Sequence, residues 1–474
     1  MMQEIAGLPY WEIQFDKDGR TDAGTRAGLL DEISRAGLTD LIIMSHGWNS
    51  SPDHARRLYR QWFGMLPPLI PRPSGAKVGT LGVLWPAMLW PDDPAPAGPA
   101  GQGGAAGLVA DPQDAGSPGA PVAALAMVYP DPAQRQILTE LAGLLDSQPS
   151  GPSSLSRFHD LMAQLAATES QDIDPVDKGA LGMLDEDPQQ LALRFASGLD
   201  QAGVAVGAPG GAPGGAGAED GLDMAGGAAD LPDVTPAGLD DVAAAGGLGD
   251  ITGRLWNGAK EALRQVSYWM MKRRAGTIGQ VAMGPFLGDL HSRASGLRVH
   301  LVGHSFGARL VSFSLAGLPA AVPTSPVHSL TLLEGAFSHF AFADRLPFDP
   351  ARGGALSGMA ARVSGPLLAC YSSHDHAVGL FYPLASMASG QDAAGLDEQT
   401  QSRWGGIGHD GAQGVAASAV TLQPRSGTYS FVAGRFTNID ASAIVCHGDS
   451  PSGAHGDIFH PELAWAMLTA ADIA

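Results

Sequence analysis

The sequence is poor in cysteine, in basic residues and in long apolar runs. Its 474 residues include two cysteines, Cys370 and Cys446, which cannot form a disulfide framework and suit a reducing compartment. Lysine and arginine number 28 against 48 acidic residues, and the net charge of −20 argues against a protein that binds phosphate backbones. The chain has no apolar run of membrane-spanning length, and its N-terminus lacks the pattern of a signal peptide. These absences predict a cytoplasmic protein with no nucleic-acid partner and no membrane span.

Glycine and proline are abundant instead, with 64 and 35 residues, and they are unevenly spread. Residues 1–90 and 251–474 have the character of folded sequence and suit one discontinuous domain. Between them, residues 91–250 form a low-complexity insertion rich in glycine, alanine and proline. Its stretch 201–250 holds no basic residue and buries too little apolar surface to offset the entropy of ordering, which predicts disorder or high mobility. A lid, a docking segment for an unknown protein partner and a simple tether all remain open as its role.

Apolar residues at helical spacing lie within this insertion and at its end. Two stripes predict helices, one at Ile137, Leu138, Leu141, Leu144 and Leu145, the other at Phe158, Leu161, Met162 and Leu165. A longer helix is predicted from an apolar face that carries Trp256, Ala259, Leu263, Val266 and Met270. Its opposite face carries Lys260, Arg264 and Lys272, which we expect to be solvated, with contact to a membrane surface as the alternative.

Short apolar runs alternate with helix signals along the two flanking segments. Strands are predicted at residues 11–15, 41–44, 78–85, 297–302, 329–333, 366–371 and 441–446. Helices are predicted after Ser51-Pro52, after Gly307 and from Pro461, since proline suits the first turn of a helix. This alternation predicts an α/β fold, with a mostly parallel central sheet flanked by helices on both faces.

The strongest local signal is Gly303-His304-Ser305-Phe306-Gly307, which stands between a predicted strand and a predicted helix. A nucleophile elbow requires this order of strand, sharp turn and helix. The flanking glycines let the helix pack close to the strand while the serine adopts a strained conformation. At the start of the helix, Ser305 would lie where the helix dipole favours developing negative charge. The motif predicts Ser305 as a nucleophile, with a plain Gly-Ser turn as the alternative.

On this motif the chain resembles the esterase and lipase branch of the α/β-hydrolase superfamily, over residues 40–85 and about 255–470. The resemblance implies the α/β-hydrolase fold and a serine hydrolase that cleaves carboxylic esters through a Ser-Asp-His triad and an acyl-enzyme. The substrate would be a small or lipid-like acyl ester, and no cofactor is implied. An acyltransferase, an amidase or thioesterase on the same triad, and a non-catalytic binding protein are the alternatives. The insertion departs from the family pattern, because it precedes the nucleophile rather than following it.

A second motif, Ser45-His46-Gly47-Trp48-Asn49, follows the predicted strand at 41–44 and is similar to the family's HG oxyanion turn. It implies that the main-chain N–H groups of Trp48 and Phe306 stabilise the oxyanion. We expect His46 to support the turn through hydrogen bonds and not to act as a base.

The acid and the base of the implied triad follow Ser305 in the chain, and each has competitors. Asp375, in the loop after the strand at 366–371, is preferred as the acid over Glu334, which ends the preceding strand. His455, in a glycine-flanked turn before the last helix, is preferred as the base over His460 and His447. The base would take the Ser305 proton and pass it to the leaving group.

Two further clusters have competing interpretations. His374, Asp375 and His376 have side chains that ligate metals, but no H-x-x-x-H or C-x-x-C pair accompanies them, so no metal is predicted. Phe337, Phe340 and Phe342 are either the wall of an acyl pocket or part of the core.

Overall fold

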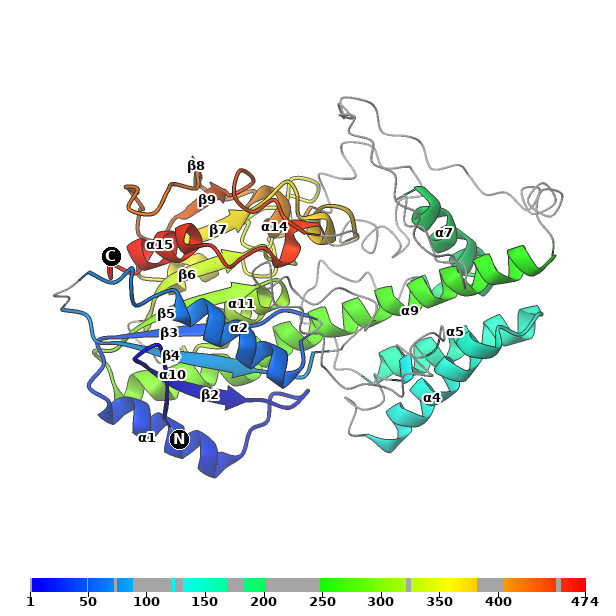
Figure 1. Ribbon diagram of the computed structural model, residues 1–474, viewed down its shortest axis with the longest axis horizontal. Helices are drawn as coiled ribbons and strands as arrows, with labels where there is room; N and C mark the ends of the chain where they lie inside the picture. The colour runs from blue at the N-terminus through cyan, green and yellow to red at the C-terminus, as the bar shows by residue number, and fades with distance from the viewer. Residues whose placement is uncertain are drawn as a thin grey trace.

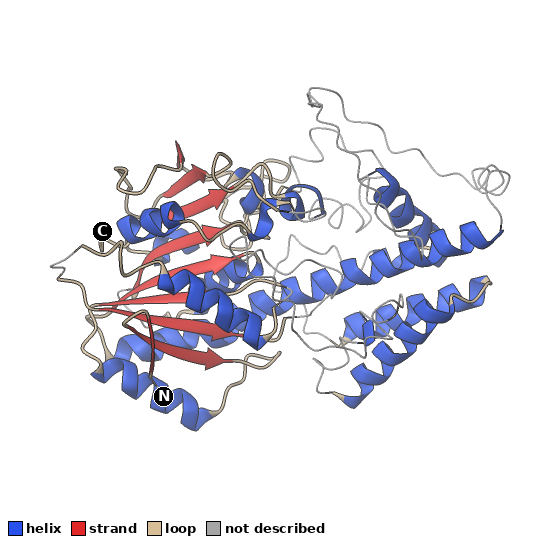
Figure 2. Cartoon of the chain, viewed as in Figure 1, coloured by secondary structure: helices blue, strands red, loops and turns tan. Residues whose placement is uncertain are grey.

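The computed structural model describes residues 2–48, 50–71, 75–87, 119, 122–123, 131–168, 183–201, 248–320, 325–381, 405–448 and 453–474. Its centre is a nine-stranded sheet with the order β1-β2-β4-β3-β5-β6-β7-β9-β8 (Figure 2). The first four strands of the chain are β1 (Gln3–Ile5), β2 (Leu8–Gln14), β3 (Asp40–Ser45) and β4 (Val78–Leu84). The other five are β5 (Arg298–His304), β6 (Val327–Leu333), β7 (Leu367–Tyr371), β8 (Ala417–Thr421) and β9 (Phe436–Asp440). Only β1 and β2 pair antiparallel among these strands, so the prediction of a mostly parallel sheet is confirmed.

Helices cover both faces of this sheet, as the sequence predicts. One face packs against α1 (Ala23–Arg35), α10 (Gly284–Arg293), α11 (Phe306–Gly317) and the C-terminal half of α9 (Leu248–Ile278). The other face packs against α2 (Pro52–Gly64) and α15 (Pro461–Ala470). In β3, Leu41 and Ile43 join the first core while Ile42 and Met44 join the second. Successive side chains of a strand point to opposite faces, so a strand covered on both sides is apolar throughout.

The insertion contributes three described helices, which gather on the N-terminal half of α9 beyond the sheet (Figure 1). These are α4 (Pro132–Ser147), α5 (Pro152–Ala167) and α7 (Pro188–Gln201). The two predicted stripes are confirmed as buried or partly buried faces of α4 and α5. Trp256 of α9 packs edge-on against Phe158, with ring centroids 5.6 Å apart, and its Nε1 donates to Pro149 O. The stretch predicted to be disordered, 201–250, lies outside the described residues except at its two ends.

One prediction on α9 is wrong. The face that carries Lys260, Arg264 and Lys272 was expected to be solvated, but Lys272 is fully buried. Its ammonium lies over the ring of Trp269, 4.3 Å from the centroid, and Arg309 Nε of α11 donates to its carbonyl oxygen. The C-terminal half of α9 packs against α11 as well as the sheet core, which leaves it no solvated face. Contact with an aromatic face makes such burial of a cation less unfavourable.

The sheet edge beyond β7 also differs from the prediction. A strand was expected at 441–446, but β9 ends at Asp440 and a turn follows, closed by Val445 N–H to Ala441 O. Asp440 Oδ1 accepts the N–H of Ser442, and such a local bond offers the backbone an alternative to the ladder. Cys446 is therefore exposed after the turn, whereas Cys370 is buried on β7.

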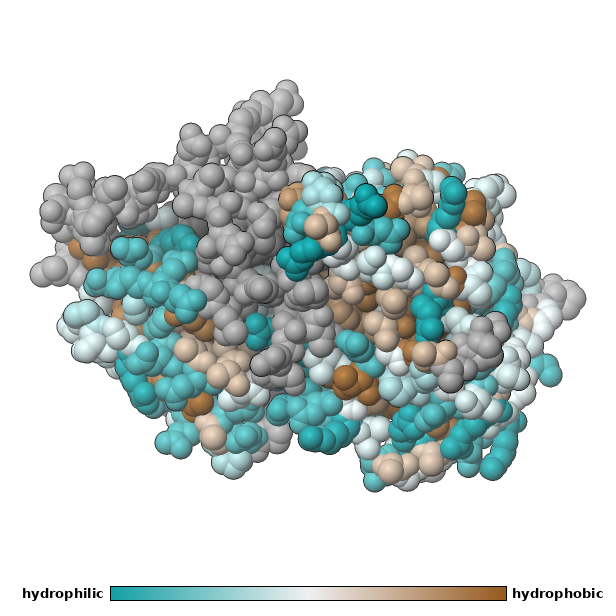
Figure 3. Space-filling view, turned by 180° about the vertical axis from the view of Figure 1, so that it is seen from behind, coloured by the Kyte–Doolittle hydropathy of each residue, from teal (hydrophilic) through white to brown (hydrophobic). Residues whose placement is uncertain are grey.

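The surface in Figure 3 is mainly hydrophilic over the described helices beyond the sheet, with apolar residues scattered among polar ones. Within the described part of the chain, no helix has the length and apolar character that a membrane crossing requires.

Candidate active site

The expected site residues lie at the carboxyl ends of strands or in the segments that follow them. The chain continues from β3 to β4 on one side and from β5 to β6 on the other, so β3 and β5 flank the point where the strand order reverses. Ligands of open α/β sheets bind at this point because the loops diverge there and leave a crevice. The turn 45–48 follows β3, and Ser305 follows β5.

Ser305 is the strained residue between β5 and α11. Its φ of 56° and ψ of −124° lie where side chains are rarely found, which costs on the order of 1–3 kcal/mol. The conformation is held by its N–H, which donates to Leu333 O at 3.1 Å. It directs the side chain out of the sheet edge, at the N-terminus of α11.

The glycines of the motif permit this geometry. A Cβ on Gly303 would lie 2.4 Å from Ala308 Cα, and one on Gly307 would lie 2.1 Å from Ser45 O. The start of α11 therefore contacts the end of its own strand and the end of β3. A larger residue at either position would separate the serine from the turn that follows β3.

The structure brings Ser305, His455 and Asp375 into one hydrogen-bonded chain. His455 Nε2 lies 2.8 Å from Ser305 Oγ, and His455 Nδ1 lies 2.8 Å from Asp375 Oδ2. Asp375 is fully buried, and its Oδ1 accepts the N–H of Val378 at 3.0 Å. A buried carboxylate at Nδ1 places the imidazole proton there and leaves Nε2 to accept from the serine hydroxyl.

The loops that carry the acid and the histidine are joined through their backbones. Asp375 and Gly453 form an isolated antiparallel bridge, and Ala454 N–H donates to His374 O at 2.9 Å. From β5, His304 Nε2 donates to the carbonyl oxygen of His455 at 2.7 Å. Burial, followed by the nearby His455, lowers the pKa of His304 to about 3, so its imidazole is neutral and acts here as a donor. These bonds fix the position of the His455 ring.

The competing histidines lie elsewhere. His460 Nε2 is 2.8 Å from Asp457 Oδ1, and His447 is exposed, with its N–H on Asp457 Oδ2. Asp457 thus links the segment after β9 to the start of α15. Neither His460 nor His447 forms a hydrogen bond with Ser305 among the interactions of the described residues.

The turn after β3 lies directly against the serine. A Cβ on Gly47 would be 2.6 Å from Ser305 Cβ, so the backbone of this turn adjoins this serine. Phe306 opens α11, and the first N–H groups of a helix have no partner within the helix. The backbone of Gly47 and the first N–H groups of α11 therefore lie beside Ser305, while Asn49 lies outside the described residues.

His46 forms hydrogen bonds within and around this turn. Its Nδ1 donates to Gly47 O at 2.8 Å, its Nε2 accepts the N–H of Trp85, and its ring stacks on the Trp85 indole. The N–H of His46 donates in turn to the Tyr59 hydroxyl. Burial lowers the pKa of His46 to about 4, which keeps the imidazole neutral with one donor and one acceptor nitrogen.

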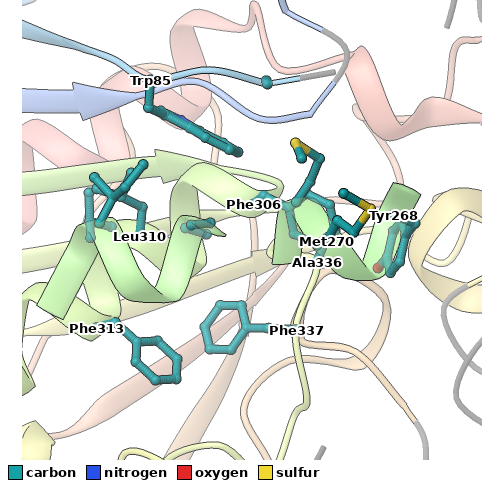
Figure 4. Close-up of a cluster of buried hydrophobic side chains, with 14 of the residues drawn as sticks. Trp85, Tyr268, Met270, Phe306, Leu310, Phe313, Ala336 and Phe337 are labelled. Atoms are coloured by element: carbon teal, nitrogen blue, oxygen red, sulfur yellow. The ribbon is translucent and has the colours of Figure 1, made fainter. Parts of the chain in front are cut away.

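Aromatic side chains line the N-terminal end of α11 (Figure 4). Tyr268 of α9 packs against Phe306 with ring centroids 4.7 Å apart, and Trp48 lies edge-on to Tyr268 at 5.6 Å. Helix α9 therefore covers the site, and Ser305 is only 4 % exposed. Phe337 and Phe342 belong to the main core and Phe340 to a smaller buried cluster, which favours the core interpretation of these three residues.

Three side chains of the site come within reach of one metal ion. Ligand atoms of His304, Glu334 and His455 lie within 4.8 Å of one another, and no other such group occurs among the described residues. Both ring nitrogens of His455 are already hydrogen-bonded, so a metal ion there would break the chain to Ser305 and Asp375. His374 and His376, which flank Asp375, are exposed and lie outside this group.

A second Ser-His-Asp chain, which the sequence analysis missed, lies towards the amino edge of the sheet. His300 Nε2 is 3.0 Å from Asp40 Oδ1, and His300 Nδ1 is 2.9 Å from Ser329 Oγ. All three are fully buried on β3, β5 and β6, so they join strands and contact no solvent. No motif marks them in the sequence, because they meet only through strand register.

Comparisons of the chain with protein-family models, with curated proteins and with solved structures found no match.

Proposed function

We propose that the chain is a serine hydrolase of the α/β-hydrolase type that cleaves carboxylic esters. The observation that carries the proposal is the pair of 2.8 Å hydrogen bonds that joins Ser305 through His455 to the buried Asp375. Both distances fall in the range that proton transfer requires. The strained serine between β5 and α11, at the reversal of strand order, also supports this fold type.

The mechanism transfers one proton through His455 at each step. Ser305 Oγ bonds to the ester carbonyl carbon while its proton passes to His455 Nε2, and the carbonyl pair moves onto oxygen. Asp375 balances the resulting imidazolium charge. When the oxyanion collapses, the bond to the leaving alkoxide breaks, and the alkoxide takes the proton from Nε2. Water then repeats the sequence on the acyl-enzyme and releases the acid.

The main-chain N–H groups of Trp48 and Phe306 would receive the oxyanion. Each such donor is typically worth about 3–4 kcal/mol of transition-state stabilisation. The aromatic lining from Trp48, Tyr268 and Phe306 suits an uncharged ester with an apolar acyl group. Acyl transfer would use the same residues, with an alcohol in place of water in the second half.

Hydrolysis of p-nitrophenyl esters of increasing chain length tests the proposal. We expect turnover by the full chain, an acyl-enzyme adduct on Ser305 in mass spectra, and a loss of at least about 10³-fold in kcat for Ser305→Ala. A metal-dependent hydrolase would instead retain activity in Ser305→Ala and lose it to a chelator. That result would overturn the proposal.

A further inference from the structure

The proposed mechanism does not use Glu334, although its backbone conformation and its buried carboxyl group are both energetically unfavourable. It follows β6 with a φ of 46°, in the left-handed region that non-glycine residues rarely adopt. It is 3 % exposed, and neither carboxyl oxygen has a hydrogen-bond partner among the described residues. Such strain and an unsatisfied buried polar group each cost about 1–3 kcal/mol. Packing alone would favour an apolar residue at this position, so burial in the core does not explain why a carboxyl group is present.

Its position places it beside the proposed catalytic imidazole. A Glu334 oxygen lies within 4.8 Å of ring nitrogens of both His304 and His455, and Oε2 is 4.0 Å from His304 Nε2. Asp375 contacts the same His455 ring from the loop after β7. Two carboxyl groups that follow neighbouring strands therefore lie close to His455, and Asp375 is the one hydrogen-bonded to it.

The surroundings decide which carboxyl is charged. Burial, followed by the charges of Asp375 and Asp457, raises the pKa of Glu334 well above its usual range. Two close buried carboxyls cannot both ionise readily, so Glu334 keeps its proton beside the Asp375 carboxylate. The Gly408 backbone of α14 (Ile407–Asp410) packs against Glu334. The titratable groups that act on it or share its surroundings are His304, Cys370, Asp375, His455 and Asp457.

We propose that Glu334 is a second positioning acid for His455, which takes the place of Asp375 when that carboxylate is removed. The inference rests on the proposed function. Without the Asp375 charge, Glu334 releases its proton to solvent and becomes the carboxylate opposite the imidazole. It then balances the positive charge that His455 gains when Ser305 transfers its proton. In the intact site Glu334 is neutral, and Asp375 alone balances this charge.

A double-mutant cycle on ester hydrolysis tests the proposal. Losing the acid of a Ser-His-Asp triad typically costs about 10⁴-fold in kcat. We expect Asp375→Asn to lose only about 10²-fold and the double variant Asp375→Asn/Glu334→Gln to lose about 10⁴-fold. Glu334→Gln should therefore cost at least about tenfold more in the Asp375→Asn background than in the wild type. If it costs the same factor in both backgrounds, Glu334 does not replace Asp375.

The pH profile separates this role from a structural one. In Asp375→Asn, kcat/KM should rise with pH in an additional step, because Glu334 must ionise before it can act. The wild type should lack this step. A profile of Asp375→Asn that parallels the wild type overturns the inference, and this test needs no variant at Glu334.

Proton NMR of protein with ¹⁵N-labelled histidine gives a test that does not depend on activity. A hydrogen bond to a carboxylate holds the His455 Nδ1 proton in slow exchange, and His455→Ala identifies its signal. We expect the signal in the wild type and in Asp375→Asn, and its loss in the double variant. If it behaves identically in the two variants, the inference fails. An absence of esterase activity with the expected NMR result would reject the proposed function alone.

Discussion

At the residue scale, two residues with strained backbone conformations lie next to each other at the carboxyl edge of the sheet. Ser305 and Glu334 follow adjacent strands, and both have left-handed φ angles, 56° and 46°. Strain of this kind persists only where the surrounding structure determines it, and it concentrates at functional sites. The motif around Ser305 predicts the first of these conformations. Nothing in the sequence around Glu334 signals the second, since its strain arises from packing against α14 and the neighbouring loops.

Gly307→Ala should damage the site through packing. Its Cβ would meet the backbone oxygen of Ser45, which cannot move unless the end of β3 moves. Overpacking of this kind typically costs about 1–3 kcal/mol. We expect a loss of that size in the free energy of unfolding, measured in urea, with a larger loss of esterase activity.

Gly28→Ala is the matched control for this substitution. Gly28 lies inside α1, and a Cβ there meets nothing within 4 Å. Replacing a helical glycine by alanine stabilises a helix by up to about 1 kcal/mol. Equal effects of the two substitutions would contradict the account of the elbow.

The protonation of His46 should limit stability in mild acid. Its folded pKa of about 4 lies below the ordinary value of 6.5, so the folded state prefers the neutral ring. This contribution is complete above pH 6.5 and is lost as the pH falls towards 4, by about 3 kcal/mol in all. His46→Gln keeps a donor and an acceptor without the titration. Its unfolding free energy should therefore fall less than that of the wild type over this interval, and parallel curves would contradict the assignment.

At the scale of elements, α9 joins two parts of the protein. Its N-terminal half packs against α5 and α7, and its C-terminal half carries Tyr268 to the site. It continues through a π-helical turn, Gly279–Met283, into α10. A Cβ on Gly279 would lie 2.3 Å from Leu310 O, so α11 passes this turn in close contact. A displacement of α9 would therefore reach both the inserted helices and α11.

Trp256→Ala should loosen the inserted helices and spare the sheet. Trp256 is buried on the face of α9 that packs against α5. Truncation of a buried tryptophan typically lowers the free energy of unfolding by about 3–5 kcal/mol. We expect faster amide hydrogen exchange in α4 and α5, with little change in β3 and β5. Asn257→Ala, at the partly exposed neighbouring position, should leave exchange unchanged. Uniformly faster exchange across the sheet would show that the two parts unfold together.

Sequence patterns predicted those elements whose apolar residues are strongly periodic. Buried parallel strands such as β3, and the stripes of α4, α5 and α9, follow directly from spacing. The failures have local causes. The strand expected at 441–446 is a turn in which Asp440 accepts the N–H of Ser442, and β9 lies before it. Strand β8 is short and exposed with small side chains, and Lys272 is buried against the ring of Trp269. The hydrogen-bonded partners of Ser305 follow the chain order that the resemblance implies. No sequence motif predicts the position of Glu334 beside His455 or the buried Asp40–His300–Ser329 chain, because both depend on how the strands are aligned.

At the scale of the whole molecule, the site combines distant segments, including those on both sides of the insertion. The insertion leaves the sheet after Trp85, which stacks on His46, and returns as α9, whose Tyr268 packs on Phe306. Arg274 of α9 donates to Pro86 O at 2.8 Å and so joins the departing and returning segments. Pro86 and α9 are thus joined near the proposed oxyanion turn. A displacement of α9 would therefore reach the site through the contact between Tyr268 and Phe306.

Labelling with a fluorophosphonate probe tests the central claim most directly, because the probe reacts with an activated serine whatever the natural substrate. We predict that the wild-type protein is labelled at Ser305 and that labelling is abolished in Ser305→Ala and reduced at least about 10²-fold in His455→Ala. Ser329→Ala, which alters the buried second chain, is the matched control and should be labelled like the wild type. No labelling of the wild type, or labelling that persists in Ser305→Ala, would contradict the account.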